Sequence, residues 1–102
     1  MLYTPPKSDS ENAMSTYEST LEVIDPIGLH ARPASQIVKL VKESGVTVML
    51  GRPGDKLVKA NSPLMLMAMK VKTGETLVIA VESDDEAAAA ALVAEIQELL
   101  RG

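Results

Sequence analysis

The order in which strand and helix signals follow one another limits the fold of this chain more than any other sequence feature. Strand patterns, rich in β-branched residues or alternating in polarity, occupy residues 16–25, 46–50, 56–60 and 77–82. Helix signals occupy residues 33–44, 62–69 and 86–100. Because strands and helices do not alternate strictly, the order β-α-β-β-α-β-α favours an α+β fold with a mostly antiparallel sheet. Helices packed on one face would leave the other face of that sheet to solvent.

Residues that start or stop helices define the expected boundaries. Gly45 suits the left-handed conformation that ends the first helix. Ser62 and Pro63 suit the N-cap and the first position of a short second helix. Residues 83–86, with the sequence Ser-Asp-Asp-Glu, have the form of a capping box before the third helix. Apolar spacing predicts the buried faces of the first and last helices, which comprise Ala34, Ile37, Val38 and Val41, and then Leu92, Ile96 and Leu99 flanked by Ala88 and Val93.

A chain of 102 residues has room for one small domain. We assign residues 17–102 to that domain. Residues 1–16 are predicted to form a disordered or flexible N-terminal tail, because Pro5, Pro6 and the polar residues after them provide no periodic apolar face. The core must be aliphatic, since aromatic residues make up only 2% of the chain and both Phe and Trp are absent.

The composition also excludes several classes of function. The chain has no Cys and one His, so thiolate metal sites and thiol catalysis are ruled out, and we expect neither a metal nor a cofactor. Its net charge of −4 argues against non-specific nucleic-acid binding. The apolar runs are shorter than the roughly 20 residues of a membrane span, and no signal peptide is visible. We therefore expect a cytoplasmic protein that does not insert into membranes.

One site for chemistry lies at the predicted junction between the first strand and the first helix. His30 is found there, within the segment Gly28-Leu29-His30-Ala31-Arg32-Pro33-Ala34. A helix N-terminus presents unpaired N–H groups and a positive dipole end, and Arg32 adds a full positive charge. These groups favour an anion, so they suit reversible phosphoryl transfer to a nitrogen of the imidazole. The alternative is that His30 is an ordinary surface or partly buried residue.

The seven-residue segment around His30 resembles the active-site motif of the histidine-containing phosphocarrier proteins, the HPr family of the phosphoenolpyruvate-dependent sugar phosphotransferase system. The resemblance extends over residues 20–100. It implies an open-faced β-sandwich, with a four-stranded antiparallel sheet and three helices on one face. It also implies that His30 takes a phosphoryl group from phospho-enzyme I on Nδ1 and passes it to an enzyme IIA. Arg32 would stabilise the phosphate, and the chain would be a monomeric carrier rather than an enzyme.

The resemblance suggests a second, regulatory site at Ser62. In many members of the family, a serine that caps the short helix is phosphorylated by HPr kinase/phosphorylase. This sequence departs from that pattern because Pro63 follows Ser62 where an aliphatic residue is usual, and Leu66 stands where glycine is common. The alternative is that Ser62 is only an N-cap.

The short second helix is also a candidate docking surface. Its apolar residues cannot all face inward on so short a helix. Leu64 and Met67 are the candidates for contacts with enzyme I and enzyme IIA, and flexible Met suits a surface with several partners. The alternative is that both side chains belong to the core.

Two other classes of function compete with the sugar phosphocarrier. Within the same family, the chain would serve a nitrogen-related phosphorelay or supply a dihydroxyacetone kinase. Outside phosphoryl transfer, it would be a regulatory or metabolite- and partner-binding module in which His30 is incidental. A free-standing enzyme is disfavoured, because the sequence shows no nucleophile–base pair and no phosphate-binding glycine loop.

Overall fold

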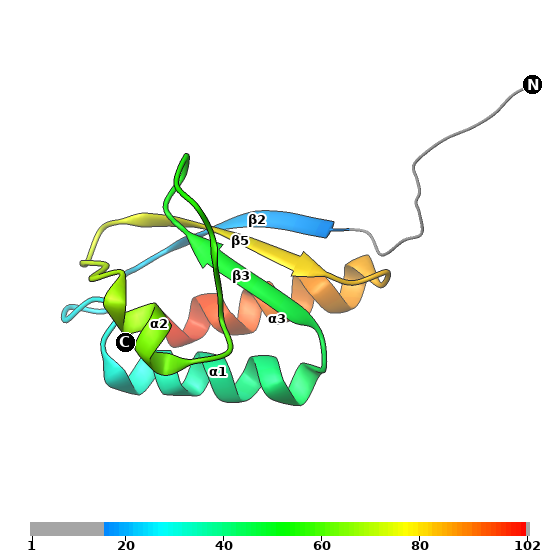
Figure 1. Ribbon diagram of the computed structural model, residues 1–102, viewed down its shortest axis with the longest axis horizontal. Helices are drawn as coiled ribbons and strands as arrows, with labels where there is room; N and C mark the ends of the chain where they lie inside the picture. The colour runs from blue at the N-terminus through cyan, green and yellow to red at the C-terminus, as the bar shows by residue number, and fades with distance from the viewer. Residues whose placement is uncertain (1–15, 102) are drawn as a thin grey trace, which may run out of the picture.

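The computed structural model describes residues 16–101, which form a layer of strands covered by a layer of helices (Figure 1). The strands are β2 (Thr16–Glu22), β3 (Thr47–Gly51), β4 (Val58–Lys59) and β5 (Thr76–Glu82). The helices are α1 (Ala31–Ser44), α2 (Pro63–Ala68) and α3 (Glu86–Leu99). The predicted element order and the open-faced α+β sandwich are confirmed. Residues 1–15, which make up nearly all of the predicted tail, lie outside the described part of the chain.

The sheet has the strand order β2-β5-β3-β4, and every neighbouring pair is antiparallel. In β5, Leu77 lies opposite Leu21 of β2, and Ile79 lies opposite Leu50 of β3. These four side chains are buried on one face, as the alternation of side chains along a strand requires. The helices cover that face in Figure 1, and α1 packs against both α2 and α3. The opposite face carries exposed residues such as Glu18 and Thr20.

The core between the layers is aliphatic, as the composition requires. Each helix contributes fully buried side chains to it, including Ile37 of α1, Leu66 of α2 and Ile96 of α3. The buried face of α1 also contains Ala34, Val38 and Val41, as predicted. Gly45 ends α1 with a φ of +74°, which confirms the left-handed cap. The core therefore fixes the position of α1, whose N-terminal end carries the candidate site.

Three local predictions need correction. Strand β4 contains only Val58–Lys59, not residues 56–60. The capping box at residues 83–86 is wrong, because the N-cap of α3 is Asp85, whose side chain accepts a hydrogen bond from the Ala88 amide at 3.1 Å. The Ser83 hydroxyl instead accepts a bond from the Asp85 amide at 3.1 Å. The buried face of α3 also differs slightly from the prediction, because Ala89 rather than Ala88 is buried and Leu100 is fully buried while Leu99 is only partly buried.

Candidate functional site

The loop between β2 and α1 is held by backbone hydrogen bonds from distant parts of the chain. The amides of Ile24 and Asp25 both donate to the carbonyl oxygen of Leu100, at 2.9 and 2.8 Å. The amide of Leu29 donates to the carbonyl oxygen of Val71 at 3.0 Å. The last turn of α3 and the segment after α2 therefore fix the loop that leads to His30.

Gly28 lets this loop approach the segment after α2 closely. Its φ is +92°, a conformation that glycine adopts without a steric penalty. A Cβ at this position would lie 2.6 Å from the carbonyl oxygen of Val71 and 3.1 Å from the Cα of Lys72. A side chain would therefore push apart the two segments that the hydrogen bond from Leu29 to Val71 joins.

His30 is the N-cap residue of α1, with φ −103° and ψ −171°. Its carbonyl oxygen accepts the first helical hydrogen bond, from the Ala34 amide at 3.0 Å, whereas its side chain makes no cap hydrogen bond. The next two residues, Ala31 and Arg32, contribute the first N–H groups of the helix, which have no acceptor within it. Pro33 contributes no N–H group. Within residues 16–101, the helix that follows His30 thus begins with two N–H groups that have no acceptor.

The imidazole of His30 is hydrogen-bonded to a buried carboxylate. Its Nε2 lies 3.1 Å from Oδ2 of Asp25. Asp25 is only 4% exposed, while the side chain of His30 is 29% exposed. The other carboxylate oxygen, Oδ1, accepts a hydrogen bond from the Ile27 amide at 2.8 Å. Among residues 16–101 no atom forms a hydrogen bond with Nδ1.

The electrostatics of the site favour the ionised form of Asp25 by lowering its pKa. The hydrogen bond from the Ile27 amide is the main cause that lowers the pKa of Asp25. Burial opposes this effect, while the hydrogen bond to His30 and the positive charges of His30 and Arg32 add to it. Arg32 is exposed, and it makes no ion pair within the described residues. Its guanidinium is therefore free to contact an anion at the start of α1.

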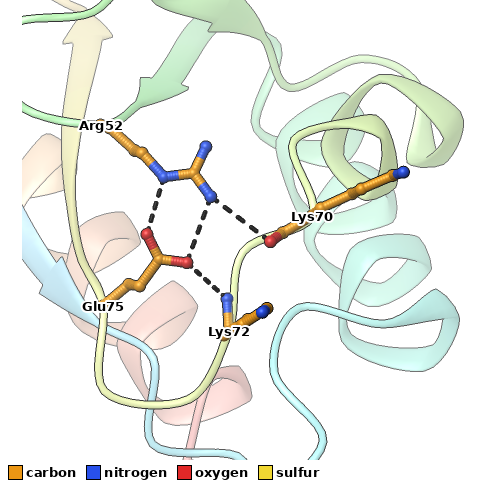
Figure 2. A network of polar contacts seen from close by, with 4 residues as sticks. All are labelled: Arg52, Lys70, Lys72 and Glu75. Carbon is orange, nitrogen blue, oxygen red and sulfur yellow. Dashed lines mark hydrogen bonds and ion pairs between the residues drawn. The ribbon is translucent and has the colours of Figure 1, made fainter.

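A second set of polar contacts, shown in Figure 2, braces the segment after α2. Arg52 donates from Nε and Nη2 to the two carboxylate oxygens of Glu75, at 2.7 and 3.1 Å, and from Nη2 to the carbonyl oxygen of Lys70 at 3.3 Å. The Lys72 amide also donates to Glu75, at 2.6 Å. Chiefly because of the Arg52 hydrogen bonds, the pKa of Glu75 is lowered to about 2. This bridge ties the β3–β4 turn to the segment that supports the His30 loop.

A family model described as "PTS HPr component phosphorylation site" matches residues 17–101. This chain belongs to the HPr family. The phosphocarrier protein HPr of Lysinibacillus sphaericus is 37% identical over 73 residues, which are 72% of this chain and 80% of that protein. HPr of Haloferax volcanii is 40% identical over 73 residues, covering 71% and 82% of the two chains. The crystal structure of HPr-C-His from Thermoanaerobacter tengcongensis has a TM-score of 0.71 at 29% identity, covering 84% of this chain and 96% of that chain.

The structure of this HPr-family chain brings His30 and Arg32 together at the start of α1, where the sequence placed them. Asp25 was not predicted as a partner of His30. Asp25 is the last residue of the predicted first strand pattern, and a contact between residues five apart across a loop follows no helix or strand periodicity. The one available signal was an acidic residue in the loop just before the histidine.

Ser62 is the N-cap residue of α2, with φ −148° and ψ 125°. Its position as N-cap, with Pro63 after it, is as predicted, although its hydroxyl makes no cap hydrogen bond. Its carbonyl oxygen instead accepts bonds from the amides of Met65 and Leu66, at 3.1 and 3.3 Å. The hydroxyl has no hydrogen-bond partner among residues 16–101 and is half-buried.

The two predicted docking residues differ in exposure. Leu64 is 73% exposed, whereas Met67 is partly buried and packs against the core. Three exposed apolar residues were missed, namely Met65 on the same helix and Ile24 and Ile27 in the loop before His30. Ile27 is also 73% exposed, although its amide is engaged with Asp25. Exposed apolar side chains therefore occur both on α2 and in the His30 loop.

Within residues 16–101, no group of three or more His, Cys, Asp or Glu side chains is arranged to hold a metal ion. None of the helices in this part of the chain is long and apolar enough to span a bilayer.

Proposed function

We propose that this chain is a phosphocarrier of the phosphoenolpyruvate-dependent sugar phosphotransferase system. It accepts a phosphoryl group on His30 from phospho-enzyme I in the cytoplasm and passes it to an enzyme IIA. The observation that carries the proposal is that His30 is the N-cap residue of α1 and that its Nδ1 is free of protein hydrogen bonds within residues 16–101. Membership of the HPr family supports the same reaction.

In the proposed reaction, the lone pair of Nδ1 attacks the phosphorus of the donor. A bond forms between Nδ1 and phosphorus, and the donor leaves with the electron pair of the bond that breaks. The phosphoryl oxygens then lie beside the amides of Ala31 and Arg32 and within reach of the Arg32 guanidinium. These groups stabilise negative charge without moving a proton, so they act electrostatically. To remove the phosphoryl group, a nitrogen of the acceptor attacks the phosphorus, and the bond between Nδ1 and phosphorus breaks.

The chain is a carrier rather than an enzyme because each partner supplies the remaining catalytic groups. The exposed Leu64 next to Met65 on α2 supplies apolar surface for enzyme I and enzyme IIA. Ser62 is the candidate for phosphorylation by HPr kinase/phosphorylase, and its hydroxyl, free of hydrogen bonds within residues 16–101, supports this assignment. A phosphate there would add negative charge at the start of α2 and alter the choice of partner.

The test is incubation of the purified chain with phosphoenolpyruvate and enzyme I, followed by intact mass measurement. We expect one acid-labile phosphoryl group per chain in the wild type and none in His30→Ala. Arg32→Ala should slow phosphorylation about tenfold or more, because it removes a stabiliser of phosphate charge. The matched control Lys42→Ala, which removes an exposed positive charge near the other end of α1, should react like the wild type. A wild-type chain that stays unmodified beside active enzyme I would refute the proposal.

A further inference from the structure

We propose that Asp25 is a positioning residue that keeps the ring proton of His30 on Nε2 and so presents Nδ1 as the nucleophile. The inference concerns the state of the ring before any reaction, and only its consequence for phosphoryl transfer rests on the proposed function. The protein geometry that supports it is the contact between Nε2 and Oδ2 of Asp25, at 3.1 Å.

In the hydrogen bond between His30 and Asp25, Nε2 must be the donor. An ionised carboxylate accepts hydrogen bonds and donates none. A neutral imidazole has one N–H group and one lone-pair nitrogen, and the hydrogen bond of one nitrogen determines the state of the other. Because Nε2 faces Oδ2, the proton is on Nε2 and the lone pair is on Nδ1. The same arrangement orients ligand histidines in metal sites, where a carboxylate fixes the tautomer from behind the ring.

Asp25 is held too firmly to turn away from the ring. Its amide donates to the carbonyl oxygen of Leu100 at 2.8 Å, and its own carbonyl oxygen accepts from the Gly28 amide at 2.9 Å and from the Thr73 hydroxyl. Its Oδ1 is engaged by the Ile27 amide. Both the backbone and one oxygen of the side chain are therefore fixed, and the remaining oxygen can only point at His30.

The position of the proton also balances the charge of the transfer step. When Nδ1 forms its bond to phosphorus, the ring retains the proton on Nε2 and gains a positive charge. The carboxylate of Asp25 faces that charge, so no proton has to leave or arrive during the transfer. When the phosphoryl group is transferred to the acceptor, the Nδ1–phosphorus bond breaks and its electron pair returns to Nδ1. The ring is then a neutral imidazole with its proton still on Nε2.

Asp25→Asn should reverse the tautomer of the His30 ring, because Oδ1 of Asp25 already accepts a hydrogen bond from the Ile27 amide. The Ile27 amide needs an acceptor, so the single carbonyl oxygen of Asn at position 25 would remain there. The Asn amino group would then face Nε2 and donate to it. Nε2 becomes the acceptor, and the proton moves to Nδ1, which blocks the lone pair. The two side chains have nearly the same shape, so the change is electronic rather than steric.

The test is NMR of the imidazole nitrogens in protein labelled with 15N-histidine, recorded at about pH 9, where an unperturbed imidazole is neutral. The chain has a single histidine, so the assignment is unambiguous. We expect the wild type to show a protonated Nε2 and an unprotonated Nδ1, and Asp25→Asn to show the reverse. The matched control Glu43→Gln removes the same charge about 20 Å along α1 and should retain the wild-type pattern.

A wild-type proton on Nδ1, or the same tautomer in wild type and Asp25→Asn, would overturn the inference. If Asp25→Asn does not fold, a wild-type proton on Nδ1 would still overturn the inference. In the enzyme I assay, Asp25→Asn should be phosphorylated about 10- to 100-fold more slowly, the range found when a partner that orients a histidine is lost. Failure of the wild type to be phosphorylated would refute the proposed function, whereas the spectra decide the role of Asp25 separately.

Discussion

Replacing Gly28 by alanine is expected to destabilise the fold more than the same change at Gly74. Both glycines have a φ of +92°, so both substitutions incur the same left-handed strain of about 1–2 kcal/mol. Replacing glycine by alanine also lowers the conformational entropy of the unfolded chain, and this stabilising effect is the same in both variants. At Gly74, however, a new Cβ would meet nothing within 4 Å, whereas at Gly28 it would lie 2.6 Å from the carbonyl oxygen of Val71.

The close approach adds a cost at Gly28 alone. The atoms nearest to the new Cβ belong to the backbone of residues 71–73 and cannot rotate away as a side chain would. Separating the two segments breaks the hydrogen bond from the Leu29 amide to Val71, which contributes about 0.5–1.5 kcal/mol. We therefore expect Gly28→Ala to lower the free energy of unfolding by about 1.5–3.5 kcal/mol, and Gly74→Ala by about 1–2 kcal/mol.

Urea unfolding followed by far-ultraviolet circular dichroism measures both values, and it suits a chain without tryptophan. The phosphorylation assay adds a functional readout, because only Gly28→Ala should displace the loop that positions His30. Equal destabilisation of the two variants would refute the reasoning, since it would mean that the contact with Val71 imposes no cost. A Gly28→Ala variant with wild-type stability would refute it as well.

Three further predictions concern other parts of the molecule. The pKa of Glu75 is about 2 in the folded chain, below its usual 4.5, so its contribution to stability is present above pH 4.5 and is lost as the pH falls toward 2; Glu75→Gln should abolish that part of the acid dependence in urea titrations, whereas Arg52→Ala should only reduce it, because the Lys72 amide still donates to Glu75. Leu66→Ala should lower the free energy of unfolding by about 2–5 kcal/mol, because Leu66 is fully buried. Leu64 is exposed, so Leu64→Ala should change the free energy of unfolding by no more than about 0.5 kcal/mol. The same variant should bind enzyme I more weakly in calorimetry. HPr kinase/phosphorylase with ATP should add an acid-stable phosphate to the wild type and none to Ser62→Ala; an unmodified wild type beside active kinase would eliminate Ser62 as a regulatory site.

Local signals account for the parts of the structure that the sequence predicted. Gly45, Pro63 and the apolar stripe on α1 act within a few residues of themselves, so they mark helices whatever the rest of the chain does. The segment around His30 is local in the same sense, because the histidine, the arginine and the helix start are adjacent in the chain. The element order and the placement of His30 and Arg32 followed from these signals.

The remaining features depend on contacts between segments far apart in the sequence. Arg52 and Glu75 are 23 residues apart, and no periodic pattern relates them. The contact of Asp25 with His30 depends on a loop shape that Leu100 and Val71 impose from outside. Local rules also misplaced the cap of α3, because both Ser83 and Asp85 are suitable cap residues and only the geometry of the chain after β5 selects Asp85.

The carbonyl oxygen of Leu100 links the loop before His30 to the last turn of α3, across 75 residues of sequence from Asp25. A partly open form in which α3 detaches from the sheet would lose both hydrogen bonds at once, and the loop would lose its support although β2 and α1 remained in place. Detachment of α3 and loss of the support for the His30 loop are therefore a single cooperative event. Under the proposed function, the fraction of chains able to accept a phosphoryl group cannot exceed the fraction in which α3 is docked.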